Sequence, residues 1–144
     1  MRSEGEQQDW MRHRREAFAV KEQALRAARE EEHQKATAMI REAIERFEAA
    51  GIAPVPLRAR PYHGAGTIRT DLVGWYLKQD RSLAVDREGR YYVMRVDGGL
   101  MSRLRGATPE PRPAPLVVGR GARDGDSFPL EELLEMRLQD PVAA

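Results

Sequence analysis

His63 is a candidate for acid–base catalysis, and it lies in the segment Pro61-Tyr62-His63-Gly64-Ala65-Gly66-Thr67. Glycines beside a histidine could let the backbone approach a ligand while the imidazole acts as a general base. A tight loop between two strands explains the same glycines. We therefore interpret this segment first as a loop, and a small enzyme with a site at Tyr62–Thr67 is the third functional hypothesis.

Other patterns for catalysis or metal binding are incomplete. The chain has no cysteine, which excludes disulfides, thiolate zinc sites and cysteine nucleophiles. Gly119-Arg120-Gly121 lacks the lysine and hydroxyl residue of a phosphate loop, and Asp124 and Asp126 lack the later ligands of a calcium loop. We expect no catalytic residue, no cofactor and no metal, so the protein should not be an enzyme.

Charge is balanced over the whole chain but not along it. The 144 residues include 24 basic and 23 acidic side chains, so no global field favours DNA or an anionic membrane. Residues 51–107 nevertheless hold ten basic and five acidic residues. No apolar run is long enough to span a membrane, and we expect a soluble, cytoplasmic protein.

The first 50 residues predict one long helix. Residues 6–50 contain neither glycine nor proline, and Gly51 and Pro54 then stop the helix. A helix from Gln7 to Ala50 would be about 66 Å long, roughly twice the diameter expected for the rest of the chain. We expect its first half to project. Its second half should pack through the stripe Ala36, Ile40, Ala43, Ile44 and Phe47.

The first half of this helix carries a thinner apolar pattern. Met11, Phe18 and Leu25 are seven residues apart, but Glu32 interrupts the series, so the coiled-coil signal is weak. A single solvated helix explains the pattern equally well. Our leading hypothesis is a non-enzymatic protein-interaction or adaptor module whose helix self-associates into an oligomer or docks on a protein partner. Its anchors would be Trp10, Met11, Phe18 and Leu25.

The rest of the chain predicts three further parts. Residues 51–106 should form a small antiparallel sheet with a hairpin over 82–96 around Asp86-Arg87-Glu88-Gly89. Residues 107–115 read as a proline-rich linker, and 116–144 as a strand and a helix that pack on the sheet. We expect Leu116–Val118 to join the sheet and Leu130–Leu138 to lie beside the helix stripe. The fold class is α+β.

The middle segment also supports an alternative hypothesis, nucleic-acid binding by a basic, aromatic sheet face. Adjacent strand residues face opposite sides, so one ring of Trp75–Tyr76 and one of Tyr91–Tyr92 should be exposed. An exposed ring beside arginines would suit stacking on single-stranded nucleic acid. An ordinary solvated sheet is the simpler interpretation. The residues of this alternative site are Arg58, Arg60, Tyr76, Arg90, Tyr92 and Arg95.

Overall fold

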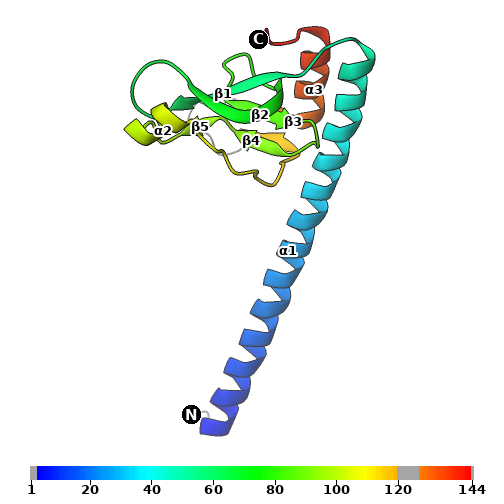
Figure 1. Ribbon diagram of the computed structural model, residues 1–144. Coiled ribbons are helices and arrows are strands. Elements are labelled where there is room, and N and C mark those ends of the chain that lie inside the picture. The colour runs from blue at the N-terminus through cyan, green and yellow to red at the C-terminus, as the bar shows by residue number, and fades with distance from the viewer. Residues whose placement is uncertain (1–2, 120–126, 144) are drawn as a thin grey trace. The chain divides into compact units, whose positions relative to one another are not determined.

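The computed structural model describes residues 3–119 and 127–143 (Figure 1). The incomplete loop patterns that contain Gly121, Asp124 and Asp126 therefore lie outside the described residues. The chain divides into two compact units, residues 1–32 and residues 33–144.

Helix α1 (Glu4–Ala49) confirms the prediction of one long, uninterrupted helix. It begins with a reciprocal cap: Glu6 N donates to Ser3 Oγ over 3.2 Å, and Ser3 N donates to Glu6 Oε2 over 3.4 Å. It ends just before Gly51, whose φ of 77° lets Ile52 N donate to the Phe47 carbonyl over 2.9 Å. Both ends of the helix are therefore specified by local residues.

The main sheet is mixed rather than purely antiparallel. Its strands are β1 (Val55–Pro61), β2 (Ile68–Tyr76), β3 (Leu83–Asp86), β4 (Tyr91–Val93) and β5 (Arg95–Val96), in the order β4-β3-β2-β1-β5. The β1–β5 pair is parallel, and the others are antiparallel. The hairpin of β3 and β4 turns at Gly89, with φ at 85°, as the sequence predicted.

Met94 joins the two ends of the strand order. It is the one residue between β4 and β5, which lie at opposite ends of the sheet. Its N–H donates to the Ser82 carbonyl, and its carbonyl accepts from Arg60 N, both over 2.8 Å. A second apolar cluster, formed by strand residues and Met94 without any helix, lies on one face of this sheet. The sheet therefore curls around its own core, with members Leu57, Ala59, Tyr76, Ala84, Tyr92 and Met94.

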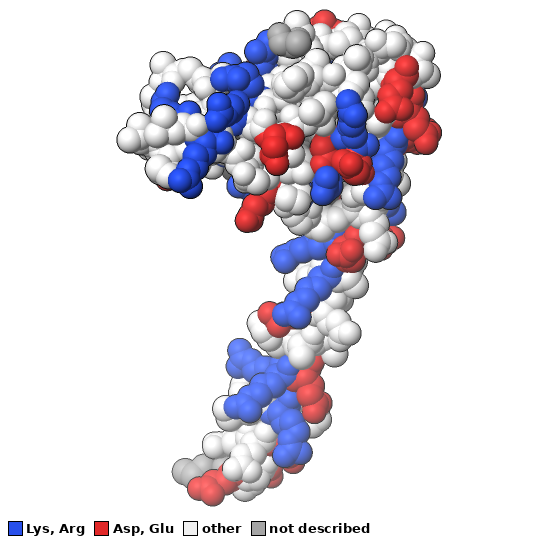
Figure 2. Space-filling view, viewed as in Figure 1, with Lys and Arg blue, Asp and Glu red and all other residues white. Residues whose placement is uncertain are grey.

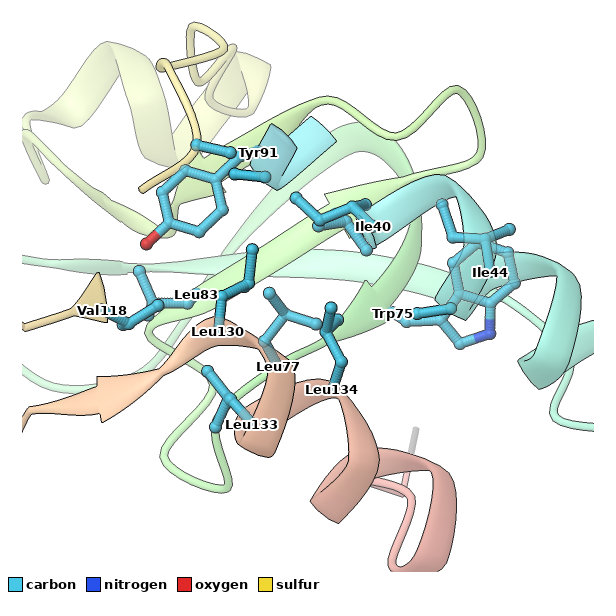
Figure 3. Packing of buried hydrophobic residues seen from close by; sticks show 14 of the residues in the cluster. Ile40, Ile44, Trp75, Leu77, Leu83, Tyr91, Val118, Leu130, Leu133 and Leu134 are labelled. Atoms are coloured by element: carbon cyan, nitrogen blue, oxygen red, sulfur yellow. The ribbon is translucent and has the colours of Figure 1, made fainter. Parts of the chain in front are cut away.

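The other face of the sheet carries the larger core. The C-terminal part of α1 packs there together with α3 (Leu130–Gln139), as the sequence predicted (Figures 1 and 3). The rings of Phe47 and Trp75 lie 5.9 Å apart, and Trp75 Nε1 donates to the Ile52 carbonyl over 2.9 Å. Figure 3 shows Ile40 and Ile44 of α1 and leucines of α3 on the same core.

The remaining elements lie in the C-terminal third: α2 (Leu100–Arg105), β6 (Val117–Val118) and β7 (Phe128–Pro129). The expectation that Leu116–Val118 joins the main sheet is wrong, because β6 pairs with β7 in a separate two-stranded sheet. The main sheet has its terminal strands tied together at Met94, which leaves little edge to extend. None of the described helices has the length and apolarity needed to cross a membrane.

The proline-rich segment lies against the sheet and α1. Arg112 N donates to the Tyr91 carbonyl over 2.8 Å, and an isolated bridge pairs Thr70 with Ala107. On the other side, His33 Nδ1 lies 2.9 Å from the Ala114 carbonyl oxygen. These contacts fasten the segment at three points along its length.

Candidate functional site

The loop around His63 gathers no catalytic partners. Residues 62–67 form a bend with every side chain exposed, and Gly64 and Gly66 adopt positive φ angles of 96° and 87°. No three His, Cys, Asp or Glu side chains converge anywhere in the described ranges. The glycines therefore have a conformational explanation, and the enzyme hypothesis gains no support from this loop.

The rings expected to be exposed on the sheet are buried. Trp75 and Tyr76 are each 5% exposed, while Tyr91 and Tyr92 are 6% and 2% exposed. Alternation does place the two members of each pair on opposite faces. The prediction of one exposed ring per pair is wrong because both faces are core, one under the helices and the other inside the curled sheet.

Tyr76 instead supports the backbone beneath one of the predicted arginines. The register of β1 against β2 shifts between Pro56 and Arg58, which leaves backbone groups without strand partners. Arg58 N donates to the Tyr76 hydroxyl over 2.7 Å, and Thr70 Oγ1 donates to the Leu57 carbonyl over 2.6 Å. The buried hydroxyl therefore fixes the position from which the Arg58 side chain leaves the sheet.

Arg90 is engaged within the hairpin. Its Nε donates to Asp86 Oδ2 over 2.7 Å, and its Nη2 lies 3.2 Å from Glu88 Oε2. The hydrogen bond to Asp86 raises the pKa of Arg90. Asp86 is itself 3% exposed and also accepts from the Tyr92 hydroxyl over 2.9 Å. Two of the predicted nucleic-acid residues, Arg90 and Tyr92, thus belong to a local structural network.

The other predicted arginines share the outer surface of the sheet. Arg58 and Arg60 are both exposed and two residues apart on β1, so they point to the same side. Arg58 pairs in register with Arg69 of β2, and Arg60 pairs with Arg95 of β5. We call this set the arginine face: Arg58, Arg60, Arg69 and Arg95. Figure 2 shows Lys and Arg side chains in a band across this part of the molecule.

Neutral acceptors hold two of these side chains. Arg58 Nε donates to Thr67 Oγ1 over 2.7 Å, and Arg69 Nη2 donates to the Leu104 carbonyl over 2.7 Å. Within the described residues, no member of the arginine face forms an ion pair. The guanidinium groups of Arg58 and Arg69 are therefore positioned without being neutralised, whereas Arg60 interacts electrostatically with Asp80.

Sequence reasoning missed Arg69. The strand was expected to begin at Val73, whereas β2 begins at Ile68. The alternation of Ile68, Arg69, Thr70 and Asp71 is the signal that would have extended the strand and placed Arg69 outward.

The predicted anchors of α1 form a second exposed surface, in the unit of residues 1–32. Trp10 and Met11 are 49% and 48% exposed, and Phe18 is 64% exposed. These three side chains line a shallow hollow with Arg14 and Arg15. The Arg14 guanidinium lies 5.1 Å from the centre of the Trp10 ring. Leu25, at 56% exposure, continues the same side of the helix two turns further on.

These two exposed surfaces, one apolar on α1 and one cationic on the sheet, are the candidate binding sites within the described residues. Comparison with known proteins adds no name to them. No protein-family model, curated protein or solved structure matches the chain.

Proposed function

We propose that this is a non-enzymatic interaction protein whose α1 helix pairs with α1 of a second copy. The observation that carries the proposal is the stripe of Met11, Phe18 and Leu25, seven residues apart and each about half exposed or more. Burying a large apolar side chain stabilises an association by about 1.5–3 kcal/mol. A second copy of the stripe would provide that cover.

The charges of the helix favour an antiparallel pair. Arg12, Arg14 and Arg15 lie near its start, and Glu30, Glu31 and Glu32 lie about five turns later. Two antiparallel copies place each basic cluster opposite an acidic one, and the same register brings Phe18 against Leu25. A parallel pair would place like charges together, which is unfavourable.

The absence of cysteine is compatible with a reducing compartment, and we propose a cytoplasmic location. An adaptor role follows from the same arrangement: self-association through α1 leaves the outer surface of the sheet available for a different ligand.

Sedimentation equilibrium over a wide concentration range tests the pairing. We expect a dimer for the full chain, and Phe18→Glu should weaken it at least about tenfold because it removes two buried rings and adds charge. Val20→Glu is the matched control. Val20 is 67% exposed but lies about 160° around the helix from Phe18, so its dimer constant should be unchanged.

Charge exchange tests the orientation. Arg14→Glu and Glu31→Arg should each weaken the dimer, and the double variant should restore it, because both positions flank the stripe on the same side and an antiparallel pair brings those sides together. Circular dichroism of each variant checks that the helix persists. A full chain that stays monomeric at every concentration would refute self-association, and a double variant weaker than either single one would refute the antiparallel arrangement.

A further inference from the structure

We propose that the arginine face binds the sugar–phosphate backbone of a nucleic acid without stacking on its bases. The site consists of Arg58 and Arg60 on β1, with Arg69 and Arg95 beside them on the neighbouring strands. It goes beyond the pairing of α1 and uses no residue of that helix.

The four arginines are placed where charge repulsion opposes them. Like charges directly opposite on neighbouring strands destabilise a sheet. Arg58 faces Arg69, and Arg60 faces Arg95, so the sheet contains two such pairs next to each other. The exposed carboxylates on the same strands or just beyond them, Asp71 and Asp97, form no ion pair within the described residues. A bound polyanion would relieve this repulsion.

Hydrogen bonds hold the guanidinium groups of Arg58 and Arg69 in place. Arg58 donates to Thr67 through Nε and Nη2, and Arg69 donates to the Leu104 carbonyl through Nη2. Each guanidinium keeps further N–H groups, now held in a fixed orientation. Guanidinium forks match phosphate oxygens, and ordered donors lose less entropy on binding than mobile ones.

The strands of the arginine face lack the exposed apolar side chains that a membrane or a protein partner would bury. None of the exposed large apolar side chains lies on β1, β2 or β5. Membrane surfaces and most protein interfaces need such side chains to be buried. Leu100, Met101 and Leu104 are exposed on α2, but that helix has only six residues. A row of exposed cations, two of them held by hydrogen bonds, without apolar neighbours on its strands is best suited to successive phosphates.

The sheet has no exposed aromatic ring on which the bases of a nucleic acid could stack. The four aromatic rings of β2 and β4 are buried, so the sheet offers no platform on which a base could stack. Tyr62 is the exposed ring nearest in sequence, at 55% exposure just after β1. Recognition therefore rests on phosphates, and affinity should depend on salt far more than on base sequence.

Fluorescence anisotropy with labelled oligonucleotides tests the proposal. Oligo(dT), oligo(dA) and a hairpin duplex are titrated with the full chain at several salt concentrations. Four phosphates neutralised predict a slope of log Kobs against log salt of about −3 for a single strand. The Arg60→Gln/Arg95→Gln variant removes two charged side chains that form no hydrogen bond within the described residues. It should weaken binding at least about tenfold and reduce the slope by about 1.5.

The matched control is Arg87→Gln/Arg112→Gln, which removes the same charge from two exposed residues elsewhere on the same unit. Its affinity should stay within about twofold of the parent. Equal losses in both double variants, or no binding at low salt, would overturn the proposal. A strong preference between oligo(dT) and oligo(dA) would overturn backbone recognition. Tighter binding to polyglutamate or to anionic phosphatidylserine vesicles than to the oligonucleotides would assign the face to a protein or a membrane instead.

Discussion

The two parts of α1 are built from the same residue types and have opposite environments. Residues 4–31 expose every side chain, including five large apolar ones, whereas residues 33–49 bury Ala36, Ile40, Ala43, Ile44 and Phe47. The difference lies in spacing. The buried residues recur at three- and four-residue intervals and form a broad stripe, while the exposed ones recur at seven and form a narrow one. In the exposed part, the helix is favoured by the helix propensity of its residues rather than by burial of an apolar face.

The largest expected effect is on stability, and it should differ between the buried and the exposed part of α1. Ile40→Ala should lower the free energy of unfolding by about 2–5 kcal/mol, because Ile40 is fully buried between α1 and the sheet. Phe18→Ala, at a position 64% exposed, should change it by less than about 0.5 kcal/mol. Urea unfolding at a concentration where the protein is monomeric measures both. Similar losses in the two variants would mean that Phe18 is covered within its own chain.

The next effect is smaller and has the opposite sign. Arg137 of α3 is 5% exposed, and its Nε and Nη1 have no hydrogen-bond partner within the described residues. It lines a cavity with Phe47 and Trp75, where the buried part of α1 ends. Because an unpaired buried cation is costly, Arg137→Met should raise the free energy of unfolding by about 1–3 kcal/mol.

Arg46→Met is the matched control for that change. Arg46 is about half exposed and forms a 2.9 Å ion pair with Glu135, whose pKa it lowers through the hydrogen bond. Losing an exposed pair of this kind should lower stability by less than about 1 kcal/mol. A destabilised Arg137→Met variant would show that the guanidinium contributes to the core rather than opposing it.

The last expected effect appears only in alkaline solution, where the buried tyrosines titrate. Burial raises the pKa of Tyr91 to about 12, and burial with the hydrogen bond to Asp86 raises the pKa of Tyr92 to about 12. The folded protein therefore favours the protonated tyrosines. That stabilisation is complete below about pH 10, the ordinary tyrosine value, and is lost as the pH rises towards 12.

Unfolding curves between pH 9 and 12 measure this loss. Tyr91→Phe should flatten the decline, while Tyr62→Phe, at an exposed position, should leave it unchanged. Residues 1–32 contain no tyrosine, so this effect acts on the unit of residues 33–144 alone. An alkaline decline identical in Tyr91→Phe and the parent would contradict the assignment.

The local elements of the fold were predictable because local residues specify them. The absence of glycine and proline over 6–50 predicted α1, and Gly89 predicted the hairpin turn. The pairing of β6 was not, because its partner β7 has only two residues and one of them is Pro129, which does not indicate a strand. The parallel β1–β5 contact was not predictable either, because strand partners far apart in sequence leave no local signal. The arginine face was predicted only in part for the same reason. Arg58, Arg60 and Arg95 alternate with apolar residues, but only the cross-strand register brings Arg69 beside them.

Met94 sets the order in which the sheet can assemble. The β3–β4 hairpin closes a short loop and can form early, whereas the contact of Arg60 with Met94 joins distant segments and must wait until β1 is in place. We therefore expect the contact between Arg60 and Met94 to form late in folding. Until it occurs, the terminal strands remain open to other chains, so the time spent before closure is when this protein is most prone to aggregate.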